Sequence, residues 1–363
     1  MLSWRLFSRI QYYQLRLIMK KQYSLQNIQM LRAFAAILVI MHHTLPHYKA
    51  MGGNLTWVTH ISTWGFVGVD IFFIISGFIM AYTTFSKERT ILNAVTFFKH
   101  RFFRIFLGYW PFFLAMITII FISNPNKLST LDILGSFFLI NANMFQLVLP
   151  VSWSLSYELY FYFLFLFTFL FSIKHLYILI PSFILGILFL VLYSYFTPTL
   201  PQSFFYSPFL LEFFAGVLLY MYKKYLMKIW ILPLSVLLML FSYWYGITHE
   251  TKNGIYRVVT FGTGAFLMVL IALIMETKNL YQSHKYFTIL GDASYTLYLS
   301  HLIILELFWM LGLRGLFQSS TPVLPLLGLA LILLLCILFS ILYYQKIEKP
   351  LYKKAIHHTL IFK

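Results

Sequence analysis

The sequence predicts an all-α, polytopic membrane protein: a bundle of about ten transmembrane helices with both the N- and the C-terminus in the cytoplasm. Three observations support this fold class. Apolar residues make up 61% of the 363 residues and charged residues only 10%, a balance typical of a chain whose main solvent is lipid. Runs of about 20 mostly apolar residues, the length that crosses a hydrocarbon core, recur along the chain. Basic residues are also divided unevenly between alternate loops.

Ten stretches have the length and hydropathy of membrane spans. They lie at about residues 29–47, 64–84, 102–122, 154–172, 176–196, 205–222, 229–246, 256–275, 289–311 and 323–344. Residues 131–149 are apolar but carry Asn141, Asn143 and Gln146. We expect this stretch to be re-entrant or interfacial rather than another crossing.

The charge pattern sets the orientation of these spans. With the N-terminus inside, 22 of the 27 Lys and Arg residues fall on the cytoplasmic side, as the positive-inside rule requires. The outer side receives Lys49, Lys127, Lys252, Arg257 and Arg314. Topology and attraction to anionic membrane lipid account for the net charge of +17, so no nucleic acid partner is expected. The pattern does not define an oligomeric state.

The chain divides into a basic cytoplasmic segment (1–27), a membrane domain (28–350) and a basic cytoplasmic tail (351–363). Met19-Lys20-Lys21 resembles a bacterial start, which suggests that residues 1–18 are an over-extended reading frame. No loop carries a nucleotide-binding glycine motif, a zinc motif or a nucleophile elbow. We therefore expect any chemistry to lie within the helical bundle, without a metal.

Ionisable residues inside a membrane are costly and usually functional. The predicted spans contain Arg32, His42, His43, Asp70, Glu158, Glu212, Asp292, His301 and Glu306. Arg32 and His43 are eleven residues apart, about 16 Å along one face of a helix. A long donor with an anionic head, such as coenzyme A, would fit this pair. The alternative is that Arg32 snorkels to lipid headgroups and His43 bonds a helix carbonyl.

Six ordered motifs resemble the membrane acyltransferase-3 family. They are Arg32 to His43, Gly68-Val69-Asp70-Ile71-Phe72-Phe73-Ile74-Ile75-Ser76-Gly77-Phe78, Ser152-Trp153-Ser154-Leu155-Ser156-Tyr157-Glu158, Glu212-Phe213-Phe214-Ala215-Gly216, Ser294-Tyr295-Thr296-Leu297-Tyr298-Leu299-Ser300-His301 and Glu348-Lys349-Pro350. The basic run Arg101-Phe102-Phe103-Arg104 is also similar, although Leu107 stands where the family usually has proline.

The resemblance implies transfer of an acyl group, commonly acetyl from acetyl-CoA, to a hydroxyl of a cell-envelope glycan. The lipopolysaccharide O-antigen at the bacterial inner membrane is the example we expect. Two alternatives remain open. One is a transporter or flippase of glycan or lipid precursors, because buried Asp, Glu and His also mark transport pathways. The other is an acyltransferase with a small-molecule acceptor.

Roles for individual residues follow from the chemistry and the motifs. His43 is the candidate general base, or the carrier of an acetyl-histidine intermediate. Asp70 or Glu158 would orient its imidazole. Arg32, Arg101 and Arg104 would bind the CoA phosphates. Trp153 and Tyr157 either pack at the outer interface or stack on a sugar of the acceptor. His301 faces the bundle, with a structural or a substrate-binding role.

Overall fold

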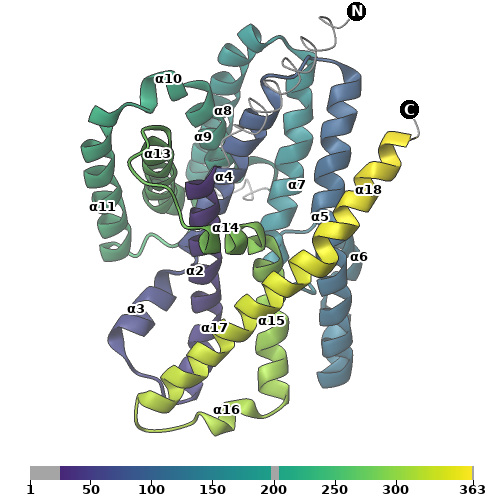
Figure 1. Cartoon of the computed structure of the whole chain (residues 1–363), viewed down its shortest axis with the longest axis vertical. Coiled ribbons are helices and arrows are strands. Elements are labelled where there is room, and N and C mark those ends of the chain that lie inside the picture. Colours follow the sequence, from purple (N-terminus) through teal and green to yellow (C-terminus); the bar gives the residue numbers. More distant parts are fainter. Residues whose placement is uncertain (1–24, 198–203, 362–363) are drawn as a thin grey trace, which may run out of the picture.

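The computed structural model describes residues 25–197 and 204–361 (Figure 1). Most of the predicted N-terminal segment therefore lies outside the described residues, as do residues 1–18. Within the described part the chain is helical and contains no strand. Nine of its helices are long and apolar enough to cross a membrane, or ten if a bent pair counts as one span. The prediction of an all-α bundle with about ten spans is confirmed.

The spans are formed by the following helices. They are α2 (Gln26–Ala50), α3 and α4 (Thr56–Trp64 and Val67–Thr84), α5 (Ile91–Ser123), α7 (Trp153–Leu166), α8 (Ile173–Phe196), α9 (Phe209–Met221), α11 (Leu232–Thr248), α12 and α13 (Gly254–Arg257 and Thr263–Thr277), α14 and α15 (Lys285–Asp292 and Ser294–Met310), α17 (Val323–Tyr343) and α18 (Lys349–Ile361). Two π-helical segments, Val258–Gly262 and Tyr344–Glu348, join α12 to α13 and α17 to α18. Shorter helices are α6 (Ile133–Phe138), α10 (Lys223–Leu226), α16 (Leu313–Leu316) and the 3-10 turns Pro125–Thr130, Pro150–Ser152, Phe167–Leu170, Phe204–Tyr206 and Ile229–Ile231.

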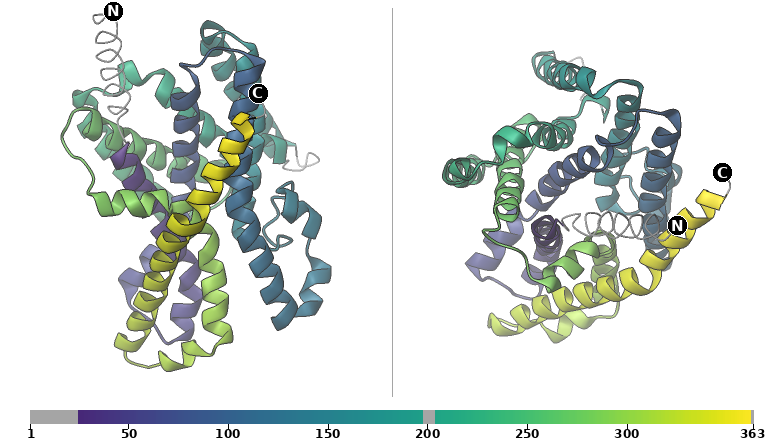
Figure 2. Two further views of the ribbon diagram at one scale, coloured as in Figure 1. Left: turned by 45° about the vertical axis from the view of Figure 1, so that its right-hand side comes forward. Right: turned by 45° about the horizontal axis from the view of Figure 1, so that its top comes forward.

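Helix α2 lies near the middle of the bundle, and α17 and α18 run along one side of it (Figure 2). Helix α2 packs against α4, α13, α14, α15 and α17. Its start is fixed by Glu276 of α13, whose carboxylate accepts the backbone N–H groups of Gln26 (2.7 Å) and Asn27 (3.3 Å). A carboxylate here satisfies two unpaired donors and complements the helix dipole. This contact sets the height of Arg32 in the bundle.

Helix α5 begins eleven residues earlier than predicted. Thr90 caps it by accepting the N–H of Asn93 (3.2 Å), and the helix then continues unbroken through Leu107 to Ser123. The charge of residues 87–101 lowers their mean hydropathy, and for this reason the sequence predicts a loop there. In the structure Arg101 and Arg104 are three residues apart on one helix, so they share a face.

The stretch 131–149 contains only one turn and a half of α-helix and does not cross the bundle. Asp132 accepts hydrogen bonds from Gly135 N (2.7 Å) and Asn141 Nδ2 (2.8 Å). The Tyr109 hydroxyl of α5 donates to the Ser136 carbonyl (2.8 Å) and fixes the segment against that helix. Buried backbone away from a helix needs such partners. The expectation that residues 131–149 do not form a span is confirmed.

The span formed by α14 and α15 contains a sharp bend. Helices α14 and α15 meet at 66°, and α14 lies across the bundle against α2 (Figure 1). Gly291 permits the approach, since a side chain there would collide with the Gln29 carbonyl. Helix α15, which follows the bend, packs against α2, and its His301 is fully buried.

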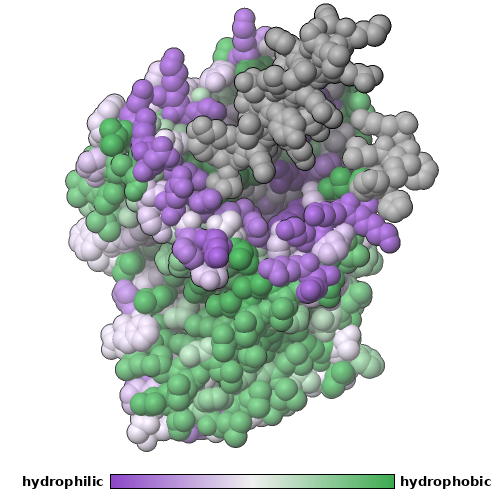
Figure 3. Space-filling view, in the orientation of Figure 1, coloured by the Kyte–Doolittle hydropathy of each residue, from purple (hydrophilic) through white to green (hydrophobic). Residues whose placement is uncertain are grey.

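In the view of Figure 3, apolar residues cover most of the lower half of the molecule, and polar residues gather above them.

Helices α4 and α9 pack with their backbones in close contact. A side chain at Gly77 would meet the Phe213 carbonyl, and one at Gly216 would meet the Ile74 carbonyl. Small residues allow such contacts between membrane helices. We expect Gly77→Ala to lower the free energy of unfolding in detergent by about 1–3 kcal/mol through overpacking.

Gly186→Ala is the matched control for this prediction. Gly186 also lies within a membrane helix, but a methyl group added there would meet no atom of the described residues within 4 Å. The substitution should leave stability unchanged or slightly raised, because alanine is the better helix former. Equal stability of the two variants would contradict a close α4–α9 contact.

Candidate active site

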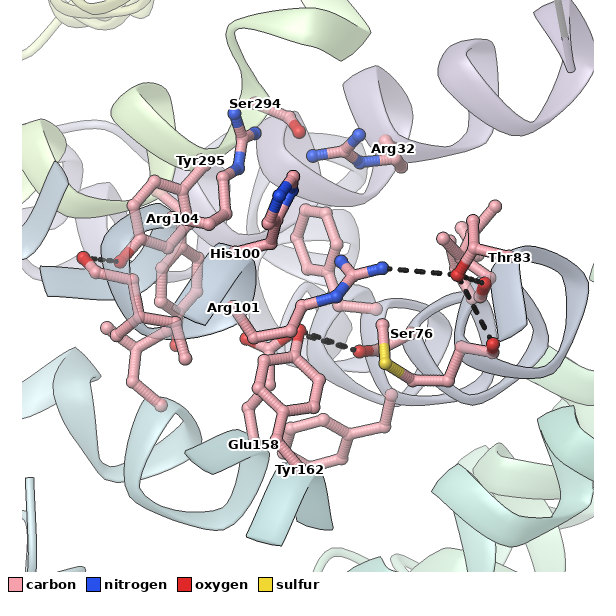
Figure 4. Close-up of a pocket in the computed structure, with 18 of the residues that line it drawn as sticks. Arg32, Ser76, Thr83, His100, Arg101, Arg104, Glu158, Tyr162, Ser294 and Tyr295 are labelled. Carbon is pink, nitrogen blue, oxygen red and sulfur yellow. Dashed lines mark hydrogen bonds between the residues drawn. The ribbon is translucent and has the colours of Figure 1, made fainter. Parts of the chain in front are cut away.

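A cavity of about 540 Å³ lies between α2, α4, α5, α7 and α15. We call it the basic cavity, because Arg32, His100, Arg101 and Arg104 line one end of it (Figure 4). Lys87 also lines the cavity. Its other lining residues include the apolar side chains of Val69, Phe72, Phe73, Ile75, Ile79, Met80 and Phe97, and the polar side chains of Ser76, Thr83, Ser154, Glu158, Tyr162, Ser294, Tyr295 and Tyr298. A ligand here would meet cations at one end and a mixture of apolar and polar side chains beyond them.

The three predicted arginines converge on this space from two helices (Figure 4). Arg32 Nη1 donates to Gln29 Oε1 (3.1 Å), and Arg101 Nη2 donates to Thr83 Oγ1 (3.4 Å). Neither forms an ion pair within the described part of the chain. Both guanidinium groups keep donors for an anion, and a planar guanidinium suits phosphate oxygens.

Arg104 differs from the other two because it has a carboxylate partner. Its Nη1 lies 3.5 Å from Oε1 of Glu348, which is 3% exposed. Glu348 also accepts a hydrogen bond from Thr296 of α15. The Glu348-Lys349-Pro350 motif thus links the end of α17 to α5 and α15. Arg104 has a structural contact in addition to its position at the basic cavity.

Glu158 lies on the wall of the basic cavity. It accepts hydrogen bonds from the hydroxyls of Ser76 (2.9 Å) and Tyr162. The guanidinium of Arg101 lies over the Tyr162 ring, 5.6 Å from its centre. The structure therefore brings Glu158 together with the arginines of the cavity, and its hydrogen bonds do not go to His43.

His43 is in contact with His301 instead. Its Nδ1 lies 2.9 Å from the Val39 carbonyl and 3.2 Å from Nε2 of His301. A carbonyl oxygen only accepts, so Nδ1 of His43 carries the hydrogen and Nε2 keeps its lone pair. The lone pair is what a base or nucleophile requires. His42, next in the chain, has its ring edge-on to that of His43 (5.3 Å between ring centres) and bonds the Ser62 carbonyl (2.9 Å).

Tyr298 connects the histidine pair to the basic cavity. It lines the cavity, and its ring centre lies 6.1 Å from that of His301. Its hydroxyl is fixed by Ser154 Oγ (2.8 Å) and by the Val151 carbonyl (2.9 Å). Tyr298 therefore lies between the deep end of the basic cavity and the His43–His301 pair.

Asp70 forms an ion pair with Arg257. Arg257 Nε and Nη2 lie 2.9 Å from the two carboxylate oxygens, and Nη2 also donates to the Phe66 carbonyl (3.3 Å). Both side chains are buried, at 0% and 8% exposure. The charge pattern counts Arg257 among the basic residues of the outer side; in the structure it lies in α12, near the start of a span, and its side chain is buried. The buried guanidinium compensates the buried Asp70 carboxylate.

The structure does not bring Asp70 to His43, since the Asp70 carboxylate is directed at Arg257. Glu212 of α9 lies beside this ion pair. Both of its carboxylate oxygens are buried without a hydrogen bond within the described residues, and a side chain at Gly262 would contact Oε1. The cluster of Asp70, Arg257 and Glu212 ties α4, α12 and α9 together.

Trp153 and Tyr157 lie on α7 within a layer of rings. Trp153 contacts Phe73 (6.0 Å between ring centres), Tyr157 (5.9 Å) and Phe209 (5.2 Å). Phe73 and Phe209 are themselves 5.7 Å apart. We call Phe73, Trp153 and Phe209 the aromatic wall. Tyr157 lies beyond it, stacked on Phe204 at 4.8 Å.

No group of three or more His, Cys, Asp or Glu side chains in the described residues is placed to hold a metal ion. The arrangement is that of an integral membrane protein with a cavity that has basic side chains at one end and lies close to a histidine pair. The chain belongs to the acyltransferase-3 family: the family model described as an acyltransferase domain matches residues 25–344. The protein is therefore a multi-pass membrane acyltransferase. No curated protein and no solved structure matched the chain.

Proposed function

We propose that the protein transfers an acetyl group from acetyl-CoA to a hydroxyl of a cell-envelope polysaccharide, such as lipopolysaccharide O-antigen, at the bacterial inner membrane. The observation that carries this proposal is the shape of the basic cavity. Guanidinium groups without a carboxylate partner in the described residues lie at one end, and the other end stops one residue from the His43–His301 pair. A long thioester with phosphates at its far end matches this arrangement.

The two ends of the cavity suit different parts of the donor. Arg32 and Arg101 would bind phosphate, with Lys87 adding positive charge at the opening. The arm of CoA would follow the apolar side chains of α4 and α5, among them Phe72, Ile79 and Phe97. The thioester would then lie at the deep end near Tyr298.

The proposed reaction needs one base and no redox step. The acceptor hydroxyl attacks the thioester carbon while its proton passes to Nε2 of His43. The C–O bond forms, the C–S bond breaks, and His43 returns the proton to the CoA thiolate. In the variant route Nε2 attacks the thioester carbon first, the C–S bond breaks and the CoA thiolate leaves. The acceptor hydroxyl then attacks the acetyl carbon, the C–N bond to the imidazole breaks, and the hydroxyl proton passes to the thiolate. His301 supports either route by holding the His43 ring at Nδ1.

Arg101→Gln tests the donor site most cleanly, because Arg101 has no carboxylate partner among the described residues that would be left unpaired. The substitution removes a charge-assisted hydrogen bond that contributes about 1.5–3 kcal/mol to binding. We therefore expect the Kd for acetyl-CoA to rise by roughly 10- to 100-fold. Equilibrium binding of acetyl-CoA to protein in nanodiscs measures it.

Lys99→Gln is the control for charge. Lys99 lies two residues away on α5, is exposed and does not line the basic cavity. Its removal should change the Kd less than about twofold, as expected for a screened surface charge. An equal effect of the two substitutions would show that only overall charge attracts the donor.

A further inference from the structure

A second cavity of about 610 Å³ lies on the other side of the aromatic wall. It is bounded by the loop 140–143, by α7 and α8, by residues 204–209 and by Gly254. We call it the loop cavity. Tyr157, Val191, Ser194, Tyr195 and Asn143 are among the side chains that line it. Its loop residues at 140–143 belong to a connection that the charge pattern predicts on the outer side of the membrane, opposite the basic residues of the first cavity.

The lining of the loop cavity combines flat rings with neutral polar groups. Tyr157 is stacked on Phe204 at 4.8 Å, and Tyr195 lies edge-on to Tyr256 at 5.8 Å. The polar groups are the hydroxyls of Ser194 and the tyrosines, the amides of Asn141 and Asn143, and one carboxylate, Asp132. Lys and Arg are absent from the described lining. Such a surface suits a ligand with apolar ring faces and many hydroxyls, which is the chemistry of a sugar.

The polar groups are not equivalent. Asn141 is committed to its own loop, because its amide donates to Asp132 (2.8 Å) and Gln146 (3.3 Å) while Oδ1 accepts from Asn143 N (2.8 Å). Asn143 uses Oδ1 to hold Phe145 N (3.2 Å), and its Nδ2 group makes no hydrogen bond within the described chain. Asn143 is also exposed. Asn141 therefore builds the loop, and Asn143 offers donors to a ligand.

The aromatic wall places the two cavities back to back. Phe73 lines the basic cavity and Phe209 lines the loop cavity, and their ring centres are 5.7 Å apart. Trp153 contacts both, and also Tyr157 of the loop cavity. The rings of Phe73 and Phe209 would thus both lie between a ligand in one cavity and a ligand in the other.

We propose that the loop cavity binds a sugar unit of the acceptor glycan other than the unit that is acetylated, with Tyr157 and Tyr195 as ring contacts and Asn143 as a hydrogen-bond donor. Because the aromatic wall separates this cavity from the donor, the reacting hydroxyl belongs to another part of the same glycan. This inference rests on the proposed acetyl transfer and adds where the acceptor binds. The acceptor enters from the side opposite to the basic end, so donor and acceptor do not compete for one opening.

The test uses full-length protein in nanodiscs, radiolabelled acetyl-CoA, and the glycolipid fraction of the native envelope as acceptor. Tyr195→Ala and Asn143→Ala are each compared with Tyr193→Ala. Tyr193 is two residues from Tyr195 on α8, similarly exposed (49% against 43%), and outside the loop cavity. Tyr195→Phe keeps the ring and serves as the rescue. The readouts are the glycolipid concentration for half-maximal transfer and the Kd of acetyl-CoA.

We expect Tyr195→Ala and Asn143→Ala each to raise the half-maximal glycolipid concentration about tenfold, the size of one lost ring contact or hydrogen bond. The Kd of acetyl-CoA should stay within twofold, and Tyr193→Ala and Tyr195→Phe should behave like the unsubstituted protein. Half-maximal concentrations within twofold for all four variants would overturn the acceptor site and leave the acetyl transfer standing. If the unsubstituted protein transferred no acetyl group to any glycolipid, both proposals would fall together.

Discussion

His43→Ala should reduce acetyl transfer by about 10²- to 10⁴-fold, the usual contribution of a general base, while leaving the Kd of acetyl-CoA within twofold. The reason is geometric: Nδ1 is occupied by the Val39 carbonyl and His301, so the lone pair on Nε2 is the reactive feature that the substitution removes. Mass spectrometry of envelope glycans measures the loss in cells, and radiolabelled acetyl-CoA measures it with purified protein.

His42→Ala is the matched control. It is the adjacent histidine on the same helix, but its Nδ1 bonds the Ser62 carbonyl and it does not contact His301. We expect less than a tenfold effect on transfer. Normal acetylation by folded His43→Ala protein would remove both the base and the acetyl-histidine route. Glycan precursors that accumulate inside cells lacking the protein, with acetylation unchanged, would favour transport instead.

Arg257→Met should destabilise the fold by about 3–5 kcal/mol, because it leaves the Asp70 carboxylate buried without its cation. Unfolding in mixed micelles by a denaturing detergent measures the change. The double variant Asp70→Asn with Arg257→Met should recover most of the loss, because neither side chain then carries an unpaired charge.

The surface pair Lys252–Glu250 provides the comparison for this prediction. It has a similar contact distance of 3.4 Å, but Glu250 is 74% exposed. Glu250→Gln should change stability by no more than about 1 kcal/mol. A double variant as unstable as Arg257→Met alone would indicate that Arg257 matters through its contacts with Phe66 and Phe209 rather than through Asp70.

The span count could be predicted because hydropathy and loop charge are summed over many residues. Single charged residues were harder to place. Lys99 and Arg101 lower the mean hydropathy and suggest a loop, yet α5 includes them because Thr90 caps it further upstream. The sequence places Arg257 at the start of a span, and only the position of Asp70 in space reveals its partner.

The sequence does not show which residues of the candidate site contact one another, because these contacts are made between helices that are far apart in the chain. Arg32 lines the basic cavity and His43 lies eleven residues further along α2, a spacing that the sequence already gives. The choice between Asp70 and Glu158 as the partner of His43 could not be made from spacing. His43 and His301 are 258 residues apart in the chain, and the 66° bend before α15 that brings them together has no clear signal in the sequence.

The aromatic wall has a consequence for the energy balance of the cell. A membrane holds a potential, and each elementary charge that leaks across 100 mV dissipates about 2.3 kcal/mol. Two cavities that opened into one another would make a water-filled pore and conduct ions. Packed rings between them exclude water and carry no charge. Donor and acceptor can then be supplied from opposite compartments while the bilayer stays electrically sealed.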